Sequence, residues 1–219
     1  YYSYVFVFDE LSKKYYVLKN QINDPEQGLV SDSYALDRVI EIKEQPSYEG
    51  QTLITQSVGM DADAHVLSLA LAESGKINLV SLQYIDFRAA KDEDPEIKEQ
   101  GILKTSESLS LAGADANTRG ILVGQDWYFV VGNKVYTSPV LKPQLADLTT
   151  LPDDLGVPVA VAVTSKETHL IIATYDAGSS HENKGSFALV DLTTKEVKVH
   201  RNVMGKCVVA KGYDANPWF

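Results

Sequence analysis

A five-residue turn recurs along the chain and constrains its fold more than any other feature. Gly59-Met60-Asp61-Ala62-Asp63 returns as Gly113-Ala114-Asp115-Ala116-Asn117 and again as Gly212-Tyr213-Asp214-Ala215-Asn216. The first two aspartates are 54 positions apart and the last two are 99 apart, which is close to two periods. Self-similarity at roughly 50 residues is typical of propellers and solenoids, in which each repeat is one supersecondary unit.

Short runs rich in β-branched and aromatic residues are separated by polar turns, as in antiparallel sheets. The predicted innermost strands are Tyr4–Phe8, Leu53–Val58, Leu109–Gly113, Val157–Val163 and Cys207–Gly212. The further strands of the last two repeats are predicted at 120–123, 127–131 and 135–140, and at 170–175, 186–191 and 197–200. Short helical turns are predicted in 31–37 or in 145–155.

The predicted fold is therefore an all-β propeller made of four-stranded blades. The approximate repeats are 1–50, 51–105, 106–153 and 154–203, followed by a closing strand within 204–219, so the chain has four blades plus one extra innermost strand. The surplus strand favours the C-terminal part of a larger ring. The alternative is a self-contained four-bladed ring, which requires that residues 1–8 do not form an innermost strand. An open blade face would expose apolar surface, which predicts self-association or a missing N-terminal portion of the ring.

Composition excludes several classes of partner and site. The formal net charge of −10 argues against nucleic acid, because phosphate binding needs clustered Lys and Arg. The single cysteine, Cys207, excludes an internal disulfide and a Cys-based zinc site. No run approaches the ~18 consecutive apolar residues of a transmembrane helix.

The densest group of potential metal ligands is Asp61, Asp63 and His65. At alternating positions, two carboxylates and an imidazole can share a strand face and hold a metal such as calcium. The alternative is a structural turn, in which Asp accepts hydrogen bonds from the following amides. The recurrence of this turn without His favours the structural role, so no cofactor is predicted other than calcium at this group.

A long polar loop at 176–184 replaces the tight turn expected between the second and third strands of the last blade. Propellers present such loops on the face that carries function, and long loops are commonly binding elements. Asp176, His181 and Glu182 are therefore the candidate ligand-binding residues. The alternative is an insertion without a function.

Catalytic signatures are missing from the sequence. It has no Gly-x-Ser-x-Gly elbow, His-Glu-x-x-His, phosphate-binding glycine loop or Cys-x-x-Cys. These observations favour a non-enzymatic module that binds a glycan, peptide or partner protein. The alternative left open is a propeller glycosidase or lyase that uses an acidic pair or a bound calcium.

The second half resembles the C-terminal region of the PKD-like lipoproteins of Bacteroidetes. The segments that carry the resemblance are 127–136 (Trp-Tyr-Phe-Val-Val-Gly-Asn-Lys-Val-Tyr), 185–192 (Gly-Ser-Phe-Ala-Leu-Val-Asp-Leu) and 202–207 (Asn-Val-Met-Gly-Lys-Cys). The resemblance covers roughly residues 105 to 210. It implies an exported bacterial protein at the periplasm or outer-membrane surface, and it brings no catalytic residues.

The repeat length and recurring Asp-Ala also look like hemopexin-type four-bladed propellers, although only Val131-Gly132 matches their Phe-Lys-Gly pattern.

Overall fold

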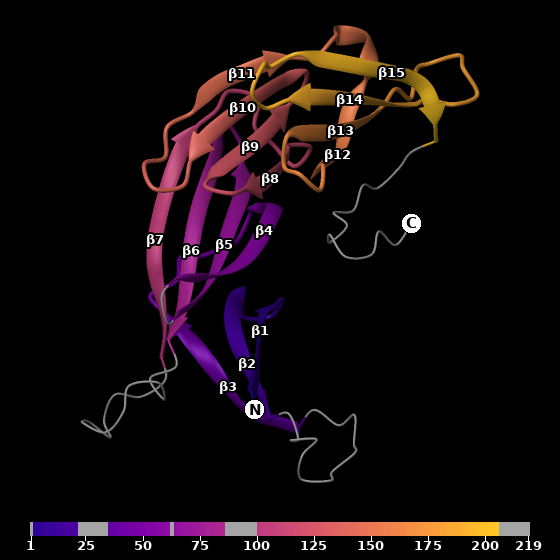
Figure 1. Ribbon diagram of the computed structural model, residues 1–219. Coiled ribbons are helices and arrows are strands. Elements are labelled where there is room, and N and C mark those ends of the chain that lie inside the picture. The colour runs from indigo at the N-terminus through magenta and orange to yellow at the C-terminus, as the bar shows by residue number, and fades with distance from the viewer. Residues whose placement is uncertain (1, 22–34, 62–63, 86–99, 206–219) are drawn as a thin grey trace. The chain divides into compact units, whose positions relative to one another are not determined.

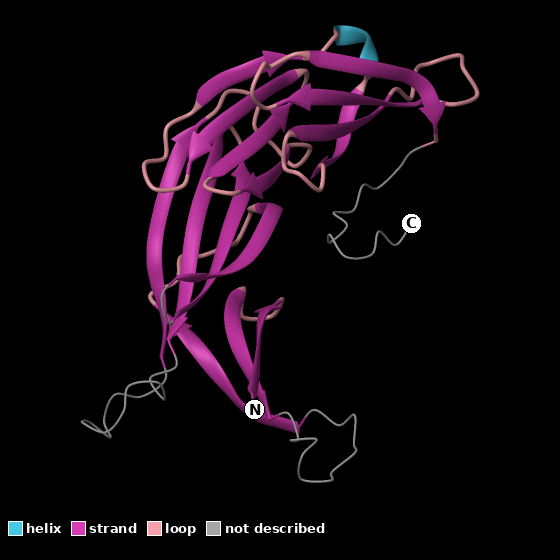
Figure 2. Cartoon of the chain, viewed as in Figure 1, coloured by secondary structure: helices cyan, strands magenta, loops and turns pink. Residues whose placement is uncertain are grey.

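The computed structural model describes residues 2–21, 35–61, 64–85 and 100–205. Within these ranges the chain forms strands β1 to β15 and one turn of 3₁₀-helix, Asp153–Leu155, so the predicted all-β class is confirmed (Figures 1 and 2). The 3₁₀ turn lies inside the segment 145–155, where a short helical turn was predicted.

Seven strands form one sheet in the order β1-β2-β3-β7-β6-β5-β4. The hairpins β1–β2 and β5–β6 are made by neighbours in sequence, whereas β3 and β7 pair in parallel over a short stretch, Ile42 with Gly101 and Lys43 with Ile102. The strands are β1 (Tyr2–Asp9), β2 (Lys14–Gln21), β3 (Ala35–Lys43), β4 (Thr52–Asp61), β5 (Ala64–Glu73), β6 (Lys76–Ile85) and β7 (Gln100–Ser110).

The chain divides into two compact units. One comprises Tyr1–Gly50, Ser57–Leu69 and Leu79–Ser106, and the other comprises Gln51–Gln56, Ala70–Asn78 and Glu107–Phe219. Strands β4, β5, β6 and β7 therefore contribute residues to both units.

The first unit has an aromatic core. Tyr15 and Tyr48 pack edge to face at 5.3 Å, and Phe8 lies 4.9 Å from Tyr15. The Gln45 side chain bonds to β2 just beyond Tyr16, where the pairing with β3 ends. It accepts a hydrogen bond from Tyr15 N and donates to Tyr15 O and Ile42 O. Burial raises the pKa of Tyr48, whose hydroxyl has no hydrogen-bond partner among the described residues.

Two four-stranded antiparallel sheets lie in the second unit. One has the order β8-β9-β10-β11 and the other β12-β13-β14-β15, so each strand pairs with its neighbours in sequence. The strands are β8 (Arg119–Val123), β9 (Asp126–Val131), β10 (Lys134–Pro139), β11 (Ala146–Thr150), β12 (Val157–Val163), β13 (His169–Tyr175), β14 (Gly185–Asp191) and β15 (Val197–Met204).

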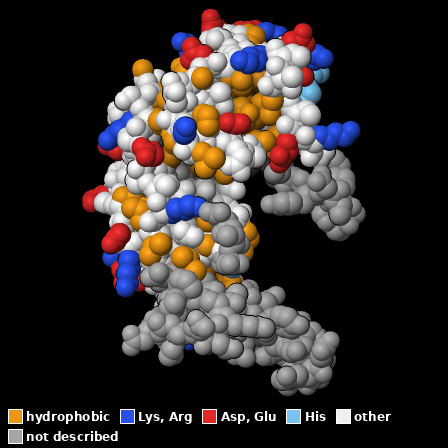
Figure 3. Space-filling view, turned by 60° about the vertical axis from the view of Figure 1, so that its left-hand side comes forward, with side chains coloured by type: hydrophobic (Ala, Val, Ile, Leu, Met, Phe, Trp, Pro, Cys, Tyr) orange, Lys and Arg blue, Asp and Glu red, His pale blue; other side chains and the backbone are white. Residues whose placement is uncertain are grey.

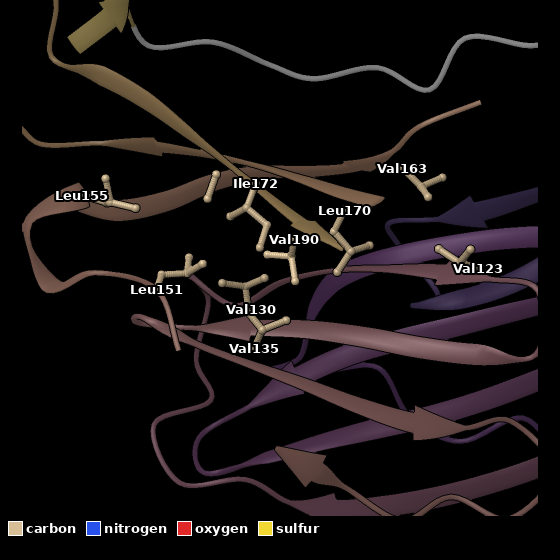
Figure 4. Close-up of a cluster of buried hydrophobic side chains, with 10 residues drawn as sticks. Val123, Val130, Val135, Leu151, Leu155, Val163, Leu170, Ile172 and Val190 are labelled. Carbon is tan, nitrogen blue, oxygen red and sulfur yellow. The ribbon is translucent and has the colours of Figure 1, made fainter. Parts of the chain in front are cut away.

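A core of buried apolar side chains joins these two sheets face to face (Figure 4). Val130 and Val135 come from the first sheet, and Leu170, Ile172 and Val190 come from the second; all five are fully buried. Alternation along each strand produces this core, because every second side chain points to the same face. Arg119 adds a polar link between the sheets, since its Nε donates to Val159 O at 3.1 Å.

The sheets differ from the predicted propeller arrangement. The predicted strands of the last repeat coincide with β12 to β15, but the prediction that Leu109–Gly113 is an innermost strand is wrong. Leu109 and Ser110 end β7, which belongs to the seven-stranded sheet beside β6. Residues 104–108 of β7 are all exposed, so the strand lacks the apolar pattern that would have revealed it.

The recurring turn also occupies different places in the fold. Asp61 is the last residue of β4, whereas Asp115 lies in the connection between β7 and β8. The Asp115 carboxylate accepts a hydrogen bond from Asn117 N at 2.7 Å, as predicted for a structural turn. The third copy, at 212–216, and the closing strand predicted at 207–212 lie outside the described residues.

On the face drawn in Figure 3, acidic and basic side chains of the described residues are interspersed. The described part of the chain contains no helix long and apolar enough to cross a membrane.

Candidate functional site

The loop 176–184, between β13 and β14, is closed at its base by the backbone. Asp176 N donates to Lys184 O at 3.0 Å, which extends the β13–β14 ladder one step beyond the pair Tyr175–Gly185. A backbone hydrogen bond therefore joins the two ends of the loop and fixes their positions.

Internal hydrogen bonds shape the loop above this base. The Asp176 carboxylate accepts from Gly178 N at 2.9 Å, and Asp176 O accepts from Ser179 N at 3.2 Å. His181 N donates to Ser179 Oγ at 3.2 Å, and the Lys184 ammonium donates to Ala177 O at 2.9 Å. Asp176 and Lys184 are thus committed to the loop's own structure, although Asp176 was predicted to bind ligand.

The tip of the loop carries the remaining predicted ligand-binding residues. His181 and Glu182 are exposed, and their side chains make no hydrogen bond or ion pair with any described residue. A short segment shaped by its own turns, with uncommitted polar side chains at its tip, is suited to recognition because little order is lost on binding.

The predicted metal group is described only in part. Asp63 and the side chain of Asp61 lie outside the described residues. His65 is the second residue of β5 and packs among aromatic rings, 5.0 Å from Tyr4 and 6.2 Å from Tyr84, so its imidazole has a packing role. The described residues contain no group of three or more His, Cys, Asp or Glu side chains arranged to hold a metal.

A second polar cluster lies at the opposite end of the same sheet, and the sequence analysis missed it. His169 starts β13 and faces Asp191, the last residue of β14, across the hairpin. His169 Nε2 lies 3.4 Å from Asp191 Oδ2, and Thr168 Oγ1 lies 2.9 Å from His169 Nδ1. The predicted strands 170–175 and 186–191 bring these residues close together, but only the register of the structure, which pairs Tyr175 with Gly185, places His169 opposite Asp191.

Main-chain donors hold the Asp191 carboxylate in the charged form. The N–H groups of Thr194 and Thr193 both donate to Asp191 Oδ1 at 2.8 Å. These two bonds, with a smaller contribution from nearby His169, lower the pKa of Asp191. A carboxylate is therefore present beside the imidazole at neutral pH.

No protein-family model and no curated protein sequence matches this chain. The resemblance to PKD-like lipoproteins therefore stays a prediction.

Proposed function

We propose that the loop 176–184 is the recognition element of a binding module with a propeller architecture, and that the role of this loop is non-enzymatic. The observation that carries the proposal is the separation of roles within the loop. Asp176 and Lys184 fix its shape, while His181 and Glu182 stand exposed at its tip. A rigid scaffold that presents such a loop is the usual way in which binding residues are positioned.

Two adjacent antiparallel sheets support the propeller part of the proposal. Sheets β8–β11 and β12–β15 each consist of four strands in sequence order and pack face to face, as neighbouring blades do. Their first strands are neighbours, since Arg119 of β8 reaches Val159 of β12. In the same unit, β4 approaches β8, because a Cβ added at Gly120 would lie 3.0 Å from Ile54 Cγ2.

The chemistry of the tip favours a polar partner. The loop contains no Tyr, Trp or Phe, so it offers no aromatic platform for stacking on a sugar ring. Hydroxyl, imidazole, carboxylate and amide groups instead suit a peptide or protein surface. We therefore propose a peptide or protein partner, with a glycan as the alternative. Export to the periplasm or the outer-membrane surface is proposed from the resemblance alone.

Binding to peptide and glycan arrays tests this function with a matched pair of variants. We expect the double variant His181→Ala and Glu182→Ala to bind any captured ligand at least about tenfold more weakly, since two charged or polar contacts are lost. The control, Lys142→Ala with Gln144→Ala, changes an exposed loop of the other sheet and should bind as the wild type does. Equal binding by both double variants would show that the loop is not the recognition element.

A further inference from the structure

Thr168, His169 and Asp191 lie next to one another at the end of the last sheet, in the order hydroxyl, imidazole, carboxylate. The Asp191 carboxylate, 3.4 Å from Nε2, favours the tautomer that carries its proton on Nε2. In that tautomer Nδ1 is the acceptor, and it takes a hydrogen bond from Thr168 Oγ1 at 2.9 Å. This is the order of groups that activates a hydroxyl for nucleophilic attack.

Local structure fixes these three residues from both sides. His169 N donates to Thr164 Oγ1 at 3.2 Å, and Leu192 N donates to Thr168 O at 2.9 Å. The hairpin register pairs His169 with Asp191, so the imidazole and the carboxylate are held by adjacent strands and not by loops. Groups held on a rigid sheet keep the geometry that catalysis needs.

The nucleophile is open to solvent. Thr168 is exposed, while the side chains of His169 and Asp191 are 37% and 28% exposed. A carbonyl compound can therefore reach Thr168 Oγ1 without displacing the residues that orient it. The same turn carries the N–H groups of Ser165 and Lys166, which donate to no described residue. Donors of this kind stabilise a developing oxyanion where they face it.

We infer that Thr168, His169 and Asp191 form an acyl-transfer site for small, exposed carboxylic esters. Thr168 Oγ1 forms a bond to the ester carbonyl carbon while its proton passes to His169 Nδ1. The tetrahedral intermediate collapses, the bond between carbon and the leaving oxygen breaks, and the alkoxide takes the proton from Nδ1. Water then attacks the acyl-threonine with His169 as the base, which releases the carboxylic acid and restores the hydroxyl. No oxidant, metal or cofactor takes part in this balance.

This activity is independent of the proposed recognition loop, which connects the opposite ends of β13 and β14. A failure of either proposal therefore leaves the other unaffected.

The test is incubation of the whole chain with p-nitrophenyl acetate at neutral pH, followed by peptide mass spectrometry. We expect one acetyl group on Thr168, no adduct at this position in Thr168→Val, and release of p-nitrophenolate slowed by about 100-fold in His169→Gln, as is typical for loss of a general base. Thr168→Ser keeps the hydroxyl and should keep the adduct. Because the adduct is located on the wild-type chain, the result does not depend on whether a variant folds.

Two control variants remove similar groups outside these three residues. Thr150→Val deletes an exposed hydroxyl on β11, and His200→Gln deletes an exposed imidazole on β15. Both should release p-nitrophenolate at the wild-type rate. Acetyl groups found on lysine or other side chains but not on Thr168, or equal rates in wild type and Thr168→Val, would overturn the inference and leave the three residues as a structural clasp between strands.

Discussion

Arg201 and Asp154 form a bidentate ion pair that ties the last strand to the 3₁₀ turn before β12. Nε lies 2.8 Å from Oδ2, and Nη2 lies 3.1 Å from Oδ1. Hydrogen bonding to this guanidinium lowers the pKa of Asp154 and raises that of Arg201. Both side chains are exposed, so the pair sets a local geometry and contributes little to overall stability.

We predict that Arg201→Gln will raise the pKa of Asp154 towards its ordinary value. In the wild type the folded state holds the carboxylate more strongly than the unfolded state does. The stability that the pair adds is therefore present above the ordinary Asp pKa and is lost as the pH falls through the lowered one. Carboxyl-carbon NMR titration of wild type and variant measures the shift directly. An unchanged pKa in Arg201→Gln would mean that the ion pair does not persist in solution.

Residue-level prediction from sequence succeeded where the chemistry was local. The turn role of Asp115 follows from its own neighbours, and the structure confirms it. The pairing of Asp154 with Arg201 spans 47 positions and could not be predicted, because no local pattern marks it. His169 and Asp191 are an intermediate case, since one hairpin register brings them together.

At the scale of elements, Gly156 has a backbone conformation that other residues do not adopt. It joins the 3₁₀ turn to β12 with φ 78° and ψ −157°, a region that is essentially restricted to glycine. A Cβ there would lie 2.5 Å from Tyr175 O and 2.7 Å from Asp176 Cα. Gly75, in the turn between β5 and β6, also has a positive φ of 76°, but a Cβ there would meet nothing within 4 Å.

These two glycines make a matched pair for a stability measurement. Gly75→Ala should cost about 1 kcal/mol, which is the strain of a left-handed alanine alone. Gly156→Ala should cost several times more, because strain and collision with the β13 backbone add together. Urea unfolding of the two variants measures the difference. Equal losses would show that the segment around Gly156 moves to accept a side chain.

The elements that sequence predicts best are those closed by short hairpins. Strands β12 to β15 follow their predicted positions, since each pairs with its neighbour in sequence and buries alternate apolar residues. Strand β7 was misread because its exposed middle has no apolar periodicity, and its pairing with β3 joins residues about 60 positions apart. Non-local pairing of this kind is decided by the whole chain and not by a window of sequence.

At the scale of the whole molecule, four strands link the two units covalently, because β4, β5, β6 and β7 each supply residues to both. We predict that Ile172→Ala, which opens a cavity in the core of the second unit, will cost about 2–5 kcal/mol. Amide exchange should then accelerate in the strands of both units, since global unfolding governs the most protected amides.

Hydrogen–deuterium exchange read out on β2 and on β13 checks this cooperativity. Leu141→Ala is the control, because Leu141 is 85% exposed and its truncation should leave both rates unchanged. Acceleration on β13 with unchanged exchange on β2 would mean that the units unfold separately despite the strands they share.

The hydrogen bond from Asp176 N to Lys184 O allows the segment between these two residues to be replaced, both in natural variants and by protein engineering. Because the β13–β14 hairpin is sealed below the loop, segments of other lengths and compositions can replace 177–183 at a small entropic cost, which grows only slowly with length. Natural variants can therefore exchange this segment without redesigning the sheet, and an epitope tag or foreign peptide can be grafted there.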